Sequence, residues 1–212
     1  MSPLEQMRQC VAQHGRDGAD AWLSQALDMI DPNALGGVRV SLARCARKVG
    51  DAAVSSATFP GWTARDAARG ALVLRAFELS DGAADAYGQW LRRGEQGEQE
   101  SLLRVLPWLP RPAQVLQHAV EACRTNSEVV FRAAALHNPF PAEHFPDLNF
   151  NQMVLKALFL GVPVGEIEGL RGRITHELLR MADDYATERR AAGRSVPDDI
   201  GLLHNLFGET ES

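Results

Sequence analysis

Acidic and basic side chains gather near the C-terminal end of the sequence. Asp183 and Asp184 are followed by Glu188, and helical spacing places Asp184 and Glu188 on one face. Acidic clusters on helices can hold magnesium, which takes carboxylate oxygens and bridges the phosphates of a substrate. Arg180 lies one helical turn before this face and Arg189 adjoins it, so ordinary ion pairing explains the same residues. We take a solvated, salt-bridged face as the default, because no second acidic cluster occurs at a matching place.

A second group of polar side chains surrounds an Asn-Pro turn between two apolar helices. Its members are His137, Asn138, Glu143, His144, Asn151 and Lys156. If they converge at one end of adjacent helices, they line a polar pocket and form, with Asp184, Glu188 and Arg189, the candidate ligand-binding set. A structural network is the more common outcome, in which Asn138 caps a helix and a buried Lys156 pairs with Glu143 or with an acid of a later helix. The sequence alone leaves both interpretations open.

The sequence offers little for metal or nucleophile chemistry. His176 and Glu177 begin an H-E pair, but Arg180 stands where the zinc motif H-E-x-x-H requires its second histidine. The chain has no G-x-S-x-G turn, no phosphate-binding loop and no dinucleotide fingerprint. We expect no metal site and no cofactor, leave catalytic residues unassigned, and favour a binding protein over an enzyme.

Composition limits the class of partner and the compartment. The chain has 212 residues and a net charge of −5, with basic and acidic residues intermixed, so we do not expect a nucleic acid partner. Three widely spaced cysteines match no disulfide or zinc pattern and favour a reducing, cytoplasmic setting. The N-terminus lacks a secretory pattern, and the most apolar run, residues 153–164, is short and contains Lys156, so we expect no transmembrane segment.

Apolar residues recur with a period close to 3.6 along nearly the whole sequence, which predicts an all-α protein. Helices are expected over residues 3–13, 19–30 and 35–49. The outer faces of the third are basic, with Arg39, Arg44, Arg47 and Lys48. Thr63 and Asp66, three residues apart, are typical of a capping box that begins another helix.

These elements predict one domain with a short tail. We expect a single all-α domain over residues 1–207 and a disordered acidic tail at residues 208–212. Within the domain we expect N-terminal helices in 1–50, a loop at 51–62, and helical hairpins with a long helix in 63–207.

A recurring proline pattern organises the second half of the chain. Pro112, Pro141 and Pro163 each precede an apolar residue by four positions, and proline favours the first position of a helix. Antiparallel hairpins stacked as a HEAT-like or TPR-like solenoid account for this pattern, and a compact helical bundle accounts for it nearly as well. Apolar residues at three- and four-residue steps then predict one long C-terminal helix over residues 166–192.

Three separated blocks in this half carry a family resemblance. The blocks are His137–Glu143, Phe150–Phe159 and Tyr185–Arg194. In this order they resemble the bacterial EboA family over about the last 90 of the 212 residues. The resemblance implies an all-α, cytoplasmic component of a pathway that makes or exports prenylated secondary metabolites. The pathway proteins encoded in the same gene cluster are then its expected partners.

Three functions are consistent with these observations. The favoured one is a non-catalytic binding or scaffolding component that handles an apolar small molecule or a partner enzyme, which predicts an apolar channel. The second is a magnesium-dependent enzyme acting on an isoprenoid diphosphate or sugar-like compound, which predicts a closed acidic pocket. The third is a simple helical adaptor for another protein, which predicts a bare apolar groove.

Overall fold

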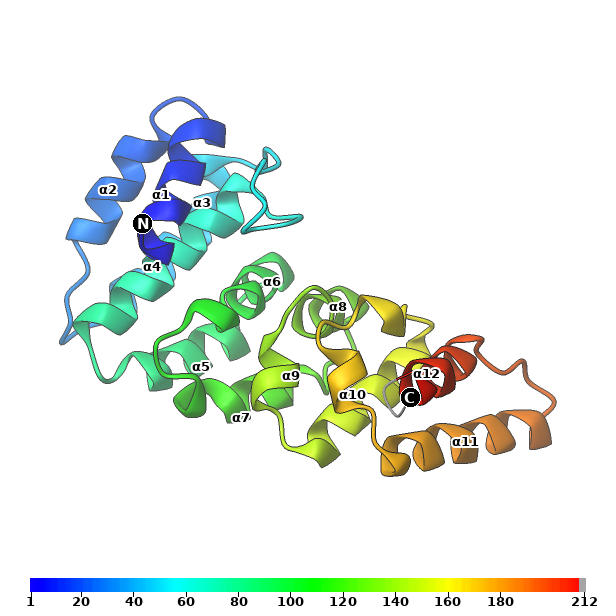
Figure 1. Ribbon diagram of the computed structural model, residues 1–212. Helices are drawn as coiled ribbons and strands as arrows, with labels where there is room; N and C mark the ends of the chain where they lie inside the picture. Colours follow the sequence, from blue (N-terminus) through cyan, green and yellow to red (C-terminus); the bar gives the residue numbers. More distant parts are fainter. Residues whose placement is uncertain (210–212) are drawn as a thin grey trace. The chain divides into compact units, whose positions relative to one another are not determined.

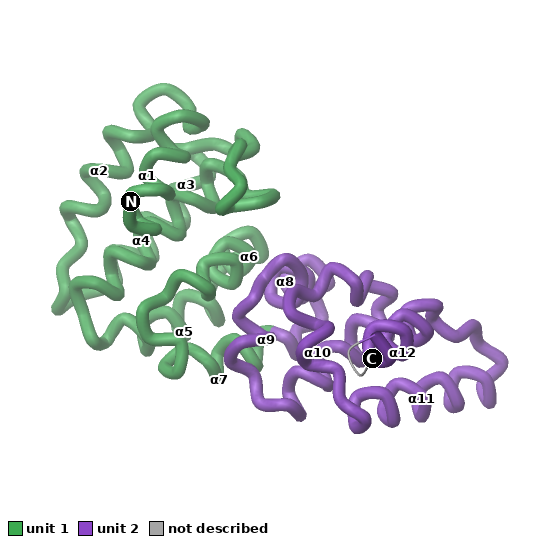
Figure 2. The backbone as a smooth tube through the Cα atoms, in the orientation of Figure 1, with its two compact units in different colours: residues 1–122 green, residues 123–212 purple. Residues whose placement is uncertain are grey.

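The computed structural model describes residues 1–209, and its regular secondary structure is helical (Figure 1). The described residues form no strand, and a single isolated bridge between Ala53 and Thr63 is their only β-type pairing. The all-α prediction is therefore confirmed. Contacts group the chain into two compact units, residues 1–122 and residues 123–212 (Figure 2). A single domain over residues 1–207 stays a prediction.

The N-terminal unit is built around one buried helix. Its elements are α1 (Pro3–His14), α2 (Ala19–Asp28), α3 (Gly36–Val49), α4 (Ala64–Leu79), α5 (Ala83–Arg93), α6 (Gln96–Arg104), the 3₁₀ helix η1 (Leu106–Trp108) and α7 (Pro112–Ala122). Helix α4 packs against α1, α3 and α6, and nearly all of its side chains are buried. The predicted loop at residues 51–62 contains no helix.

The start of α4 confirms the predicted capping box. The Thr63 hydroxyl accepts the backbone N–H of Asp66 at 3.2 Å, and the Asp66 carboxylate accepts the backbone N–H of Thr63 at 2.9 Å. The same carboxylate accepts a hydrogen bond from Ser101 at 2.6 Å and pairs with Arg104 at 2.8 Å. Arg69, on the next turn of α4, donates to Ser101 and to two backbone carbonyls. This buried network joins α4 to α6 through charge-assisted hydrogen bonds.

All charged residues of α3 are basic, and all are exposed. Its four cationic side chains are Arg39, Arg44, Arg47 and Lys48. The helix contains no acidic residue, and no ion pair within residues 1–209 involves any of the four. The only side-chain hydrogen bond among them within that range runs from Arg39 to the carbonyl oxygen of Arg93.

The C-terminal unit contains five α-helices and two 3₁₀ helices within its described residues. Its elements are α8 (Glu128–Ala135), α9 (Phe140–His144), α10 (Asp147–Leu160), the 3₁₀ helices η2 (Val164–Glu166) and η3 (Leu170–Arg173), α11 (His176–Ala191) and α12 (Asp199–Gly208). Helix α10 contacts α11, and α11 contacts α12. The tail predicted to begin at Gly208 falls partly within α12, Glu209 pairs with Arg171, and residues 210–212 lie outside the described residues.

The predicted long helix over residues 166–192 is wrong in its first third. Helix α11 begins at His176, after two 3₁₀ turns. Gly169 has a φ of 72°, in the left-handed region that interrupts a right-handed helix. Thr175 is the N-cap of α11, and its side chain accepts the backbone N–H of Leu178 at 3.2 Å.

The proline pattern marks helix starts in two of its three copies. Pro112 is the first residue of α7, and Pro141 lies in the first turn of α9. Pro163 precedes only the 3₁₀ helix η2, so the third copy does not begin an α-helix. Whether the hairpins form a solenoid or a bundle stays a prediction. Within residues 1–209, no helix is both long and apolar enough to cross a membrane.

Candidate functional site

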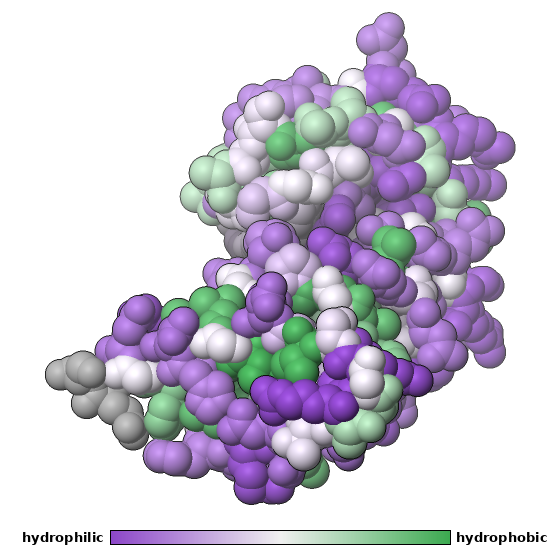
Figure 3. Space-filling model, turned by 90° about the vertical axis from the view of Figure 1, so that its right-hand side faces the viewer, coloured by the Kyte–Doolittle hydropathy of each residue, from purple (hydrophilic) through white to green (hydrophobic). Residues whose placement is uncertain are grey.

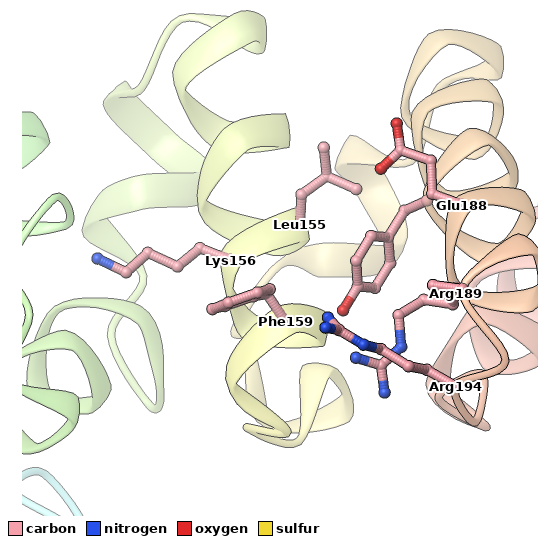
Figure 4. A pocket seen from close by; sticks show the side chains of 8 residues that line it. Leu155, Lys156, Phe159, Glu188, Arg189 and Arg194 are labelled. Atoms are coloured by element: carbon pink, nitrogen blue, oxygen red, sulfur yellow. The ribbon is translucent and has the colours of Figure 1, made fainter.

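A cavity of about 660 Å³ lies between α10 and the C-terminal end of α11 (Figure 4). Its lining residues are Leu155, Lys156, Phe159, Tyr185, Glu188, Arg189, Ala192 and Arg194. All of them belong to the C-terminal unit. The cavity is open to solvent, and its lining combines apolar side chains with two arginines.

The cavity is lined by one face of α10 and one face of α11. Leu155 and Phe159 are four residues apart on α10 and therefore share a face. Tyr185 and Arg189 are four residues apart on α11 and share a face, and the C-cap residue Ala192 continues that face three residues later. Phe159 is 65% exposed, although an aromatic side chain is normally among the more buried residues. The apolar wall is thus presented to solvent.

The end of α11 fixes the two arginines beside each other. Gly193 has a φ of 66°, and its N–H donates to the Arg190 carbonyl at 3.0 Å. The N–H of Arg194 donates to the Arg189 carbonyl at 2.9 Å. These two bonds form a Schellman motif, which ends helices with a glycine in the left-handed conformation. Arg189 also donates through Nε to the Ser195 carbonyl at 2.8 Å, which ties the following turn to the helix.

Polar groups in the cavity are incompletely paired. The Arg189 guanidinium lies 6.0 Å from the centroid of the Tyr185 ring, and the buried Tyr185 hydroxyl has no hydrogen-bond partner. Within residues 1–209, the Arg194 side chain makes no hydrogen bond or ion pair. Figure 4 shows both guanidinium groups at one end of the cavity, whereas the Glu188 carboxylate points toward the other end.

Lys156 contributes its stem to the cavity and its charge to another contact. Figure 4 shows its side chain extending away from the labelled residues of α11. The ammonium group donates to the carbonyl oxygens of Cys123 at 2.6 Å and Thr125 at 2.5 Å, and it lies 5.1 Å from the Phe131 ring. Desolvation lowers the pKa of Lys156. The expectation that Glu143 or a helical acid pairs with Lys156 is therefore wrong, because backbone carbonyls take that place.

The other residues around the Asn-Pro turn have separate local partners. Asn138 is 3% exposed, donates to the Ala133 carbonyl at 3.2 Å and accepts the Phe140 N–H at 3.1 Å. The His137 ring lies 3.3 Å from the Glu166 carboxylate. Glu143 and His144 contact each other at 3.7 Å, and Asn151 is buried at 3% exposure. Of the six residues in this group, only Lys156 lines the cavity.

The acidic cluster on α11 is distributed among different partners. Asp184 pairs with Arg180 at 2.7 Å, as the ion-pair interpretation predicts, and Asp183 lies 2.9 Å from His204. Glu188 alone of the three acids lines the cavity. Among the described residues, no three His, Cys, Asp or Glu side chains are placed to hold a metal ion.

Neither Cys123 nor the cavity lining offers an activated thiol or serine nucleophile. Burial raises the pKa of Cys123 to about 12, although Lys156 acts weakly in the opposite direction. A thiol with such a pKa is not a thiolate near neutral pH and is therefore a poor nucleophile. The cavity lining contains no cysteine, serine or histidine.

Sequence reasoning assigned three of the lining residues to the candidate site and missed the other five. It named Lys156, Glu188 and Arg189. It missed Leu155, Phe159, Tyr185, Ala192 and Arg194. Two signals were available in the sequence. Leu155 and Phe159 are four residues apart, as are Tyr185 and Arg189, and the Gly193-Arg194 pair is typical of the end of a helix.

A family model described as "Metabolite traffic protein EboA" matches residues 4–204 of the chain. The chain belongs to the EboA family. The match extends across the N-terminal unit, well beyond the C-terminal blocks that carry the resemblance in the sequence. Every lining residue of the cavity lies within the EboA match. No curated protein and no solved structure matches the chain.

Proposed function

We propose that this EboA-family protein is a non-catalytic carrier that binds an apolar metabolite in the cavity between α10 and α11. The family description, metabolite traffic, supports a role in handling small molecules. The cavity volume of about 660 Å³ falls in the range of small-molecule sites. A carrier needs an accessible site from which its ligand can leave, and an open cavity meets that need.

The exposed aromatic wall is the observation that carries the proposal. Phe159 and Leu155 present adjacent apolar surface to solvent, and Ala192 faces the same cavity. Exposed apolar surface grouped in this way marks binding sites more often than a scattered exposed residue does. On the face that Figure 3 presents, apolar side chains gather into a patch that borders strongly hydrophilic ones.

The chemistry of the lining favours binding over catalysis. Its single carboxylate, Glu188, has no serine, cysteine or histidine beside it in the cavity to activate. Catalysis by a serine or cysteine nucleophile needs such a pair within hydrogen-bond reach. Asp184, which a magnesium enzyme of this type would use, is paired with Arg180.

The proposal also names the kind of pathway to which the ligand belongs. We infer from the family that the ligand belongs to a secondary-metabolite pathway with prenylated intermediates. In that setting the protein acts in the cytoplasm as a carrier or scaffold for the pathway proteins encoded beside it. A branched apolar chain without hydrogen-bonding groups suits the wall formed by Leu155 and Phe159.

A neutral apolar fluorophore tests the carrier function. N-phenyl-1-naphthylamine gains fluorescence on entering an apolar site, and its titration gives a dissociation constant. We expect binding by the wild-type chain and a loss of about tenfold in affinity for Phe159→Ser, since a large apolar contact is removed. Leu148→Ser is the matched control, because Leu148 is 61% exposed on the same helix but does not line the cavity.

The outcomes separate the carrier from the adaptor. If the probe does not bind, or if Leu148→Ser weakens it as much as Phe159→Ser does, the cavity is not the apolar site and the carrier proposal is wrong. An adaptor would then be expected to retain a partner protein through the same exposed surface, with Phe159→Ser releasing that partner.

A further inference from the structure

We propose that the ligand of this cavity carries an anionic group, a carboxylate or a phosphate, which Arg189 and Arg194 hold together. This inference rests on the carrier function and specifies its ligand as an amphiphilic anion. The apolar body contacts Leu155 and Phe159, and the charged end lies between the two guanidinium groups.

Backbone geometry organises the two arginines before any ligand arrives. The Schellman motif joins the backbone of Arg194 to that of Arg189 through a hydrogen bond of 2.9 Å. The contact from Arg189 Nε to the Ser195 carbonyl orients one guanidinium and leaves its other donors available. Arginine presents a planar set of donors that matches carboxylate and phosphate oxygens, so two arginines whose backbones are held next to each other at one end of a cavity are suited to an anion.

Arg189 and Arg194 are the arginines that line the cavity, and neither has an acidic partner among residues 1–209; Arg190, which lies outside the cavity, has none either. In the same unit, Arg171, Arg173 and Arg180 each form an ion pair with a carboxylate. Neither Arg189 nor Arg194 forms an ion pair within residues 1–209, although the whole chain has a net charge of −5. Two like charges placed side by side repel each other, and an anion bound between them relieves that repulsion.

The Tyr185 hydroxyl supplies a third polar group. Its oxygen is buried and has no hydrogen-bond partner, and Tyr185 lines the same cavity beneath Arg189. Buried hydroxyl groups are nearly always hydrogen-bonded, so an unpaired one indicates a missing acceptor. A ligand oxygen held by the arginines provides that acceptor if binding moves aside the side chains that cover the hydroxyl.

The charge distribution in the cavity also sets the direction in which the ligand binds. The Glu188 carboxylate points to the end opposite the two guanidinium groups. An anionic group is repelled at the Glu188 end and attracted at the arginine end. The ligand therefore binds with its charged group toward Arg194 and with its apolar body along α10.

A matched pair of fluorophores isolates the anionic group. The first is 1-anilinonaphthalene-8-sulfonate, and the second is N-phenyl-1-naphthylamine, which has the same ring system without the sulfonate. We expect the wild-type chain to bind the anionic probe more tightly. Arg194→Gln should weaken the anionic probe by about tenfold and leave the neutral probe unchanged, because one charge-assisted contact is lost.

Arg190→Gln is the matched control for this experiment. Arg190 is an exposed arginine on the same helix, adjacent to Arg189 in the sequence, and its side chain does not line the cavity. It should leave the affinity for both probes unchanged. If Arg190→Gln weakens the anionic probe as much as Arg194→Gln does, the sulfonate is responding to general surface charge and the inference is overturned.

Competition distinguishes the two anion classes. Decanoate and decyl phosphate are each titrated against the bound anionic probe, with decanol as the neutral comparison. Displacement by either anion but not by decanol supports the inference, and the more effective anion identifies the headgroup. If decanol displaces the probe equally well, the charged group adds nothing and the inference is wrong.

Failure of the inference differs from failure of the carrier function. If the neutral probe binds and depends on Phe159, but the anionic probe binds no more tightly, the site is apolar without an anion subsite. If neither probe depends on Phe159, the carrier function itself fails.

Discussion

Lys156 Nζ lies 2.6 Å from the carbonyl oxygen of Cys123, and this contact ties α10 to the segment that precedes α8. The same ammonium group also donates to the Thr125 carbonyl. Two backbone acceptors at the start of the C-terminal unit therefore depend on one side chain. They lie between α7 and α8, where no helical hydrogen bond is available to satisfy them.

Lys156→Met should destabilise the protein by about 1–3 kcal/mol, because it keeps the apolar stem and leaves two acceptors without their donor. Equilibrium urea unfolding followed by circular dichroism measures the change. Gln152→Met changes an exposed position on the same helix and should alter the unfolding free energy by less than about 0.5 kcal/mol. Equal effects from the two variants would show that the contact contributes no stability.

Asp66→Ala should be more damaging, with a loss of about 2–4 kcal/mol in unfolding free energy. The substitution removes the acceptor of the Thr63 N–H in the capping box of α4, the acceptor of Ser101 and the partner of Arg104 together. Asp85→Ala, which removes an exposed acid from the first turn of α5, is the control. A loss for Asp66→Ala no larger than that of the control would contradict the role assigned to the buried network.

The stability of the protein should depend on pH through the ionisation of the Asp66 carboxylate. Desolvation favours a higher pKa for Asp66, but Arg104 and hydrogen bonds from Ser101 and Thr63 outweigh it and hold the pKa below its usual value of 3.8. A pKa that is lower in the folded state adds stability above pH 3.8, and that stability is lost as the pH falls through the folded-state pKa. Urea unfolding at pH 6, 5, 4 and 3 should show this loss in the wild type. The loss should be smaller in Asp66→Asn, and an identical pH profile in the two proteins would refute the assignment.

Two glycines near the C-terminus should respond in opposite directions to alanine. Gly193→Ala should cost about 1 kcal/mol of unfolding free energy, because a φ of 66° is unfavourable for alanine. Gly201→Ala should add about 0.5–1 kcal/mol, because Gly201 lies inside α12 with open space around it. Thermal unfolding compares the variants directly. Gly193→Ala should also weaken binding of the anionic probe, since it loosens the turn that places Arg194.

Local chemistry made several elements predictable from the sequence. The capping box of Thr63 and Asp66 and the helix start at Pro112 need only a few neighbouring residues, and both occur in the structure. The ion pair of Arg180 and Asp184 was predictable for the same reason, since one helical turn separates the two residues.

Long-range geometry was harder to infer. Ile167, Leu170 and Ile174 have helical spacing and are buried, but they lie around 3₁₀ turns, so their pattern indicated burial rather than an α-helix. The acceptors of Lys156 are backbone carbonyls, which every residue has and no side-chain pattern reveals. The cavity depends on α10 facing α11, and the spacing of Leu155 and Tyr185 within their own helices does not specify that pairing.

The basic face of α3 makes the net charge of −5 a poor guide to how the protein behaves on an ion-exchange column. Adsorption to a charged matrix depends on the local potential over a region comparable in size to the Debye length, about 10 Å at 0.1 M salt. Four exposed cations on one helix without an acidic neighbour on that helix present such a region. We therefore expect a cation-exchange resin to contact this acidic protein through α3, where Glu95 and Glu98 line the same depression as Arg39, Arg44 and Arg47.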